Sequence, residues 1–152
     1  MNKVIFIQIF KYGVVGIVNT LLTAVTIWIM LRGVFGIKDD QAASAGVMFV
    51  SNFIGYVVGI INSFIFNRNW TFKSKSNWKL GFFKFLLAFG VCYLFQLSIV
   101  LFFNAYISIP AVKFSIFNVD HIITSAYIYQ LIGIVSYSIL NFLINKYYAF
   151  NK

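Results

Sequence analysis

Two stretches of the sequence gather the side chains best suited to holding a polar ligand. Residues 62–72 read Asn-Ser-Phe-Ile-Phe-Asn-Arg-Asn-Trp-Thr-Phe, and residues 140–150 read Leu-Asn-Phe-Leu-Ile-Asn-Lys-Tyr-Tyr-Ala-Phe. Arg68 offers a planar fork to phosphate oxygens, and Lys146 offers a point charge at the matching position. Each cation follows a hydrophobic segment, so the pattern indicates a phosphate site at one end of an apolar helix.

The two stretches are related as an internal repeat. When Asn67 is set on Asn145, the cations, the aromatic residues and the final phenylalanines also coincide. An aromatic-Lys-aromatic triplet opens the first apolar segment of each half, at residues 10–12 and 83–85. We therefore predict a helical hairpin used twice, with repeat 1 over about 10–72 and repeat 2 over about 83–150. Because each hairpin crosses a membrane an even number of times, the repeats would be related by an axis along the membrane normal.

The lysines of the two triplets bring the number of matched cations to four. We expect Lys11 and Lys84 to lie at the same depth as Arg68 and Lys146, at one membrane interface. Basic pockets between spans bind anionic lipid headgroups, which makes these four residues the predicted phosphate ligands. The alternative explanation is snorkelling of long basic side chains toward water, together with membrane topology.

Aromatic rings and amides supply the remaining candidate contacts. Trp70 and Tyr148 either belong to the aromatic belt of a membrane interface or stack on a sugar ring. An amide without a partner in hydrocarbon costs about 2–7 kcal/mol, so amides inside apolar segments need a hydrogen bond or water. Interhelical hydrogen bonds are one interpretation and a polar interior is the other, with Asn62 and Asn141 nearest the end that a headgroup would enter. The amides concerned are Asn19, Asn52, Asn62, Gln96, Gln130 and Asn141.

Composition identifies the setting as a membrane. Of the 152 residues, 61% are hydrophobic and 10% are charged, and the mean hydropathy is +0.89. Soluble domains carry roughly 25% charged residues, so we predict a single transmembrane domain over 1–152. The net charge of +9 belongs to segments between spans and not to a soluble face. We therefore expect no nucleic acid partner, and attraction to anionic membrane lipid instead.

Four charge-free apolar segments predict an all-α membrane protein with four transmembrane helices. Each segment is close to the roughly 20 residues that a bilayer core requires. Residues 2–11 suit a short interfacial helix before the first span, and residues 111–121 are expected to form the second outer loop. The length of the first apolar run and the lack of a cleavage site argue against a signal peptide. The spans are expected at about 12–31, 42–66, 85–107 and 122–145.

The basic residues divide unequally between the two sides of these spans. Nine lie on the side of both termini, and three lie on the other side together with every acidic residue. The positive-inside rule therefore places both termini and the middle loop in the cytoplasm. The nine are Lys3, Lys11, Arg68, Lys73, Lys75, Lys79, Lys84, Lys146 and Lys152.

Small residues recur along the second span. Ser51, Gly55, Gly59 and Ser63 are spaced by four and so lie on one helix face, where close helix packing is the expected role. A similar face on the first span, with the same expected role, is made by Gly13, Gly16, Thr20 and Thr23.

Several chemistries have no residues to support them in this sequence. The four spans contain no acidic, basic or histidine side chain, so a proton or cation relay is not expected. Neither a G-x-x-x-x-G-K-[ST] run nor an H-E-x-x-H motif is present, and no nucleophile has a candidate base. We expect a protein without catalytic residues, metal or cofactor.

The order and spacing of these motifs resemble the GtrA-like family of small four-span membrane proteins. The resemblance rests on residues 10–20 (Phe-Lys-Tyr-Gly-Val-Val-Gly-Ile-Val-Asn-Thr) and on the stretches 62–72 and 140–150, and it covers essentially the whole chain. Lys146 and Tyr148 stand where relatives often carry Arg and Trp, which keeps the charge and the ring but loses the bidentate fork.

This resemblance implies flipping of a polyprenyl-phosphate-linked monosaccharide across a bacterial cytoplasmic membrane, for glycosylation of a cell-surface polymer such as wall teichoic acid or O-antigen. It also implies membrane glycosyltransferase partners. The alternative is a non-transporting subunit that recruits or stabilises a glycosyltransferase through its small-residue stripe and its basic loop 73–79. Four short helices scarcely enclose a headgroup, so a homo-oligomer is expected. The sugar contacts expected of a flippase are Asn19, Asn62, Asn67, Asn141, Asn145, Trp70 and Tyr148.

Overall fold

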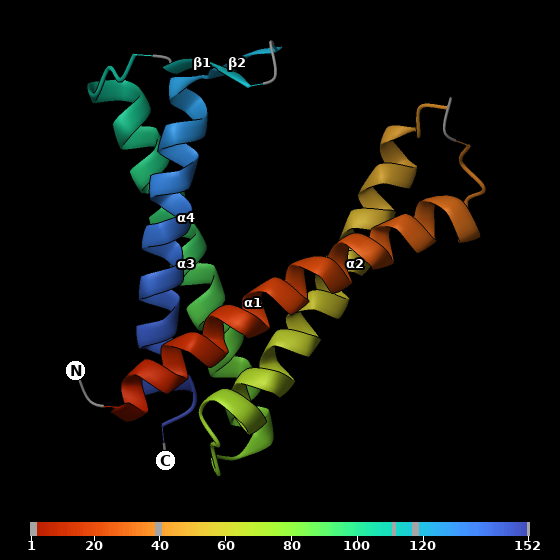
Figure 1. The fold of residues 1–152 in the computed structure, drawn as a ribbon. Coiled ribbons are helices and arrows are strands. Elements are labelled where there is room, and N and C mark those ends of the chain that lie inside the picture. The colour runs from red at the N-terminus through yellow and green to blue at the C-terminus, as the bar shows by residue number, and fades with distance from the viewer. Residues whose placement is uncertain (1–2, 39–40, 111, 117–118, 152) are drawn as a thin grey trace. The chain divides into compact units, whose positions relative to one another are not determined.

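Four long helices make up most of the chain in a computed structural model that describes residues 3–38, 41–110, 112–116 and 119–151. Three of these helices end in a five-residue π-helical turn, and a two-stranded hairpin precedes the last helix (Figure 1). The helices are α1 (Lys3–Ile29), α2 (Ala45–Phe66), α3 (Trp78–Tyr106) and α4 (Ser125–Ile144). The π turns are η1 (Met30–Val34), η2 (Asn67–Thr71) and η3 (Asn145–Ala149), and the strands are β1 (Val112–Ile116) and β2 (Val119–Ile123).

The expectation of a four-span membrane protein is confirmed. Four helical segments of 25 to 32 residues, including their π turns, are long and apolar enough to cross a membrane. Side-chain caps fix where two of them begin: Ser44 Oγ accepts from the Val47 amide at 3.4 Å, and Asn77 Oδ1 accepts from the Lys79 and Leu80 amides at 3.0 and 3.2 Å. Each cap satisfies amides that the first helical turn leaves without a partner.

One local expectation is wrong. The separate interfacial helix expected at residues 2–11 does not form, because α1 runs unbroken from Lys3 into the first span. The segment expected as the second outer loop contains a hairpin that was not predicted, in which β1 pairs antiparallel with β2 from Val112 opposite Ile123 to Ile116 opposite Val119. Both five-residue strands are rich in β-branched residues, which favour extended backbone. The fourth helix consequently begins at Ser125 and not at about residue 122.

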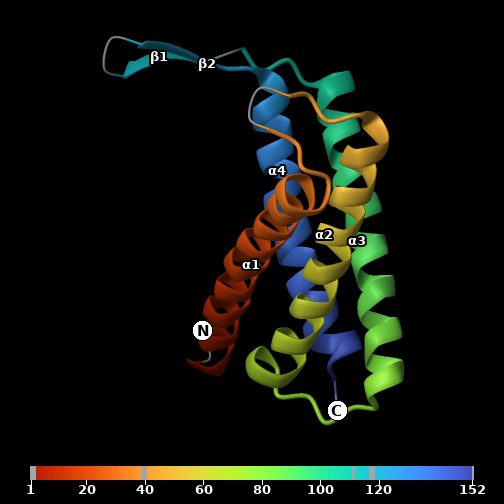
Figure 2. The same ribbon diagram turned by 90° about the vertical axis from the view of Figure 1, so that its right-hand side faces the viewer.

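The helices form two compact units, unit 1 (Met1–Lys75) and unit 2 (Ser76–Asn151). In unit 1, α1 packs beside α2 and η2; in unit 2, α3 packs beside α4 and η3. Figure 2 shows the same two helix pairs from another side. Each unit is thus an antiparallel helical hairpin, with its two ends of chain at the end that carries the π turn η2 or η3.

A glycine allows the two helices of each unit to approach closely. A Cβ built on Gly55 would lie 2.6 Å from Ile27 Cγ1, and one on Gly133 would lie 2.8 Å from Val100 Cγ2. The pairs Gly55–Ile27 and Gly133–Val100 occupy matching positions of the two repeats. Close packing is therefore the role of the Gly55 position in both units.

The small-residue face of the second span packs as expected, and Thr23 of the first-span face packs against it, but Gly13 and Gly16 do not. Ser51 is fully buried, Gly55 and Gly59 are buried, and a Cβ on Gly59 would lie 2.5 Å from Thr23 Oγ1. Gly13 and Gly16 instead face open space, with no atom of the rest of the described chain within 4 Å of an added Cβ. The packing role predicted for these two glycines is wrong within unit 1, because α2 crosses α1 on another face.

The π turns η2 and η3 begin at matching asparagines and have the same hydrogen-bond pattern. The amide of Asn67 is shared between the carbonyls of Ser63 and Phe64, and the amide of Asn145 between those of Asn141 and Phe142. Each turn closes with a bond spanning five residues, from the Phe72 amide to Asn67 O and from the Phe150 amide to Asn145 O, both at 2.9 Å. Turns of this kind are rare and often mark functional sites.

Candidate functional site

The cation–aromatic pairs at the η2 and η3 ends of the units carry the predicted phosphate ligands. Lys11 Nζ lies 5.0 Å from the centre of the Trp70 ring and donates to the Trp70 carbonyl at 3.4 Å. Lys84 Nζ lies 5.0 Å from the centre of the Tyr148 ring. In each unit a lysine of the first helix therefore meets an aromatic ring of the π turn. Cation–π attraction of this kind contributes about 0.5–2 kcal/mol.

A pair of aromatic rings lies next to each of these lysines. Tyr12 and Phe72 have ring centres 6.2 Å apart, and Phe85 and Phe150 have ring centres 5.9 Å apart. Phe85 and Phe150 are buried at 3% exposure each, so this contact anchors the π turn to the first helix of unit 2. The residues that matched in sequence therefore also make matching contacts.

Arg68 and Lys146 are the second residues of the same π turns but have different neighbours. Arg68 is half-buried, and its Nη1 donates to Asn69 Oδ1 at 3.3 Å. Lys146 Nζ lies 5.2 Å from the Tyr147 ring centre and 5.8 Å from that of Phe142. Unit 1 thus places two cations, Lys11 and Arg68, at one helix end, and unit 2 places Lys84 and Lys146 at one helix end. A ring of all four cations stays a prediction.

Three of the amides predicted to contact a sugar are enclosed by their own helix pair. Asn67, Asn141 and Asn145 are 2%, 7% and 0% exposed. Asn145 Nδ2 donates to Asn141 Oδ1 at 2.8 Å, and Asn141 Nδ2 donates to Tyr137 Oη at 3.2 Å. In the matching place of unit 1, Asn67 Nδ2 donates to Ser63 Oγ at 3.2 Å. These bonds tie each π turn to the preceding helix, and sugar contact by these amides stays a prediction.

The remaining amide pair joins α1 to α2. Asn62 Nδ2 lies 3.5 Å from Asn19 Oδ1, at the long limit of a hydrogen bond. Gly59 lies beside this pair, since a Cβ there would be in ordinary contact with Asn19 Oδ1 at 3.4 Å. The interhelical hydrogen bond that was one of the two interpretations of these amides is therefore present for Asn19 and Asn62.

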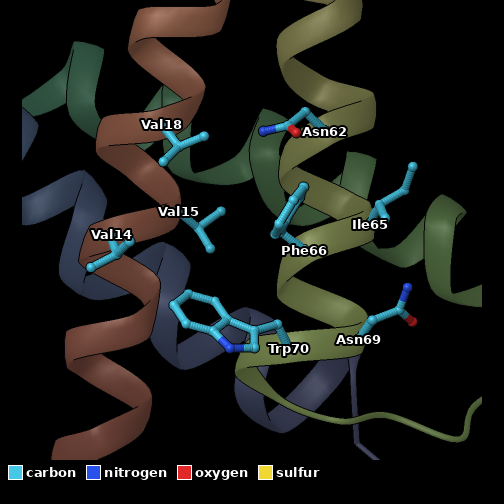
Figure 3. A pocket seen from close by; sticks show the side chains of 8 residues that line it. All are labelled: Val14, Val15, Val18, Asn62, Ile65, Phe66, Asn69 and Trp70. Carbon is cyan, nitrogen blue, oxygen red and sulfur yellow. The ribbon is translucent and has the colours of Figure 1, made fainter.

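A groove of about 360 Å³ lies between α1 and α2, next to the Lys11–Trp70 contact. Figure 3 shows Val15 and Val18 pointing from α1 toward α2, with Asn62, Phe66 and Trp70 pointing back. Its surface is overwhelmingly apolar, and Val15, at 3% exposure, is its most buried wall. The lining residues are Val14, Val15, Val18, Asn62, Ile65, Phe66, Asn69 and Trp70.

Sequence reasoning identified only part of this site. Asn62 and Trp70 were predicted contacts, but Asn69 and the valines were not. Asn69 could have been found from its place between Arg68 and Trp70, whereas Val14 and Val18 look like any other residues of an apolar span. Tyr137, which accepts the Asn141 hydrogen bond, was also missed, although it lies one helical turn before that amide.

No group of three or more His, Cys, Asp or Glu residues able to hold a metal ion occurs among the described residues. The polar atoms at the η2 and η3 ends are instead ammonium and guanidinium groups and amides. Such groups are suited to recognising an anion, and aromatic side chains beside them are typical of residues at a membrane interface.

Comparison with protein families gives one match. The family model described as "GtrA/DPMS, transmembrane domain" covers residues 11–150, from the first lysine of the site to the last residue of the Phe85–Phe150 ring pair. Comparisons with curated proteins and with solved structures gave no match.

Proposed function

Because the chain belongs to the GtrA/DPMS transmembrane family, we propose that it flips a polyprenyl-phosphate-linked monosaccharide across the bacterial cytoplasmic membrane. Family membership ties this multi-pass membrane protein to flipping of glycosyl-phosphate lipids or to glycosylation. The proposal goes further, in that the flipped sugar would serve glycosylation of a cell-surface polymer such as wall teichoic acid or O-antigen.

The observation that carries the proposal is the lysine held on an aromatic ring at the same end of each hairpin. Lys11 lies over Trp70 and Lys84 lies over Tyr148, both at 5.0 Å. With Arg68 and Lys146 on the π turns, these lysines would bind the lipid phosphate at the cytoplasmic interface. The positive-inside rule supports that orientation, because nine of the twelve basic residues lie on this side.

A flippase must also lower the energy barrier that the sugar meets when it crosses the hydrocarbon of the membrane. Each hydroxyl that loses its water in hydrocarbon without a new hydrogen bond costs about 2–7 kcal/mol. Asn19 and Asn62 form the amide pair within the spans of unit 1 and are the proposed polar step on this path. Directionality would come from consumption of the lipid by a glycosyltransferase at the outer face. A homo-oligomer would provide further enclosure of the headgroup.

The test uses proteoliposomes that contain the pure protein and a labelled polyprenyl-phosphate sugar. We expect label from the inner leaflet to reach an added impermeant reagent faster than in empty vesicles, and Arg68→Ala to remove this acceleration. Lys3→Ala, which removes one exposed charge from the same side, should leave it unchanged. Transport at the wild-type rate by folded Arg68→Ala protein would refute the phosphate site, and no acceleration by the wild type would refute the flippase.

A second candidate function, recruitment of a membrane glycosyltransferase, is favoured by the loop between η2 and α3. This loop exposes Lys73 and Lys75, Lys79 is exposed on the first turn of α3, and Lys73 has a left-handed backbone with φ 50°. The small-residue stripe, which was the other docking surface considered, is buried against α1 and leaves the loop as the candidate. Under this function, Lys75→Glu with Lys79→Glu should abolish co-purification of the glycosyltransferase. An intact complex after this charge reversal would contradict it.

A further inference from the structure

We propose that the groove between α1 and α2 binds the isoprenoid chain of the lipid next to its phosphate, with Lys11 and Arg68 holding that phosphate. The inference rests on the proposed function for the identity of the lipid. It assigns the apolar groove to the isoprenoid chain of the bound lipid, so that Asn62 and Trp70 would not contact the sugar before it starts to cross, and Asn62 would act as a polar step only during crossing.

The composition of the groove wall favours a hydrocarbon ligand. Five of its eight lining residues are Val, Ile or Phe, and the amides Asn62 and Asn69 lie at its two ends along α2 and η2. A sugar placed here would lose the water of several hydroxyls and meet few hydrogen-bonding groups. A volume of about 360 Å³ is at the lower end of the range for small-ligand sites, so it suits a short segment of chain.

The charges near the groove fix the direction in which an amphiphile would lie. Lys11 contacts Trp70 and Arg68 contacts Asn69, and both of these partners line the same end of the groove. The segments 11–18 and 62–70, which form this part of unit 1, contain no acidic residue. A phosphate would therefore sit at the Trp70 end.

The far end of the groove lies deeper in the span. Trp70 lies eight positions after Asn62 along the helix, which corresponds to about 12 Å along the axis. A chain attached to a phosphate at Lys11 would follow the groove toward Val18 and Asn62. This places the hydrocarbon in the span and the charge at the interface, as the bilayer requires.

Unit 2 provides a comparison, because its matching residues have a different character. The positions of Asn62 and Asn69 are taken by Leu140 and Tyr147, and that of Val15 by Ala88. Val91 matches Val18 and is similarly exposed, at 47% against 44%. Substitution of Val91 is therefore a matched control for substitution of Val18.

The experiment measures binding of farnesyl phosphate to the full-length protein in zwitterionic lipid nanodiscs by calorimetry. Val18→Trp, which fills the groove, should weaken binding at least about tenfold, and Val91→Trp should change it less than about twofold; a tenfold change is about 1.4 kcal/mol. Farnesol and inorganic phosphate should each bind at least about tenfold more weakly than farnesyl phosphate, because each lacks half of the ligand. Ile65→Trp, from the opposite wall, repeats the test if Val18→Trp does not fold.

The assignment of the groove would be overturned if Val18→Trp and Val91→Trp weakened farnesyl phosphate binding equally, or if neither variant weakened it. Full displacement of farnesyl phosphate by phosphatidylglycerol would also overturn it, because it would make this a site for bulk anionic lipid. The binding experiment and the transport assay can fail independently of each other. A wild-type protein that flips lipid while Val18→Trp binds normally refutes only the groove, and a protein that binds in the groove without flipping refutes only the flippase.

Discussion

Lys11 is held by Trp70 through two contacts at once, since its ammonium lies over the indole ring at 5.0 Å and donates to the carbonyl of the same residue at 3.4 Å. The ring and the carbonyl both belong to the π turn η2, so the position of a charge on α1 depends on how α2 ends. The ammonium has three donors, and its remaining N–H groups are available to a phosphate.

Trp70→Leu should weaken binding of a phosphate lipid by releasing Lys11 from the ring. The expected loss is the cation–π contribution of about 0.5–2 kcal/mol, which corresponds to roughly twofold to thirtyfold in affinity. Trp70→Tyr should restore most of the affinity, because Tyr148 fills the same role for Lys84. Calorimetry with farnesyl phosphate measures both variants, and equal losses for Leu and Tyr would speak against the aromatic contact.

Gly55→Ala should destabilise unit 1, because its new methyl group would lie 2.6 Å from Ile27 Cγ1 and 3.2 Å from the Thr23 carbonyl. Overpacking of this kind costs about 1–3 kcal/mol. Gly90→Ala is the control, since no atom of the rest of the described chain lies within 4 Å there, and helix propensity favours alanine. Unfolding in detergent at increasing dodecyl sulfate measures the difference, and equal stability of the two variants would refute the close contact.

Asn141→Leu should lower the free energy of unfolding by about 1–3 kcal/mol, because it leaves the buried Asn145 amide without its acceptor. The double variant Asn141→Leu with Asn145→Leu should cost less than the sum of the single variants, since both ends of the bond are then gone. The same denaturation assay provides the double-mutant cycle. Strict additivity would mean that the two amides do not interact in the membrane.

Membrane orientation can be tested with single cysteines in a Cys92→Ser background, in which the buried native thiol is absent. Lys75→Cys in the middle loop should react with an impermeant maleimide only after the cytoplasmic side is opened. Lys38→Cys, in the first outer loop, should react in intact cells. The reverse pattern would contradict the positive-inside assignment.

The membrane-spanning helices could be predicted from the sequence, because charge-free apolar runs of about twenty residues are typical of such helices. The sequence was also sufficient to match residues between halves, and the matched residues Lys11 with Trp70 and Lys84 with Tyr148 make the same contact. These observations support the proposal that the two units are copies of one hairpin. The contact itself was not predictable from either half, because its partners are 59 residues apart in unit 1.

The groove and the faces of α1 could not be predicted for a different reason. Inside a membrane, lipid-facing and helix-facing positions are both apolar, so periodicity carries little information about which face is packed. Val18 and Val91 are alike in type and exposure, yet only Val18 lines the groove described in unit 1. The exposed Gly13 and Gly16 show the same limit, since their spacing resembled that of the buried Gly55 and Gly59.

At the π turns η2 and η3, the number of residues matters as much as their chemical type. A π turn holds one residue more than an α turn, so it shifts the phase of every later side chain by one position. Asn67 and Thr71 are both buried, as are Asn145 and Ala149, which places one face of each π turn against its own unit. Deletion of one residue from either turn would return the backbone to α-helical phase and carry Trp70 or Tyr148 around the helix, away from its lysine. Helix ends usually tolerate small insertions and deletions, but in this protein these two segments are expected to keep a constant length.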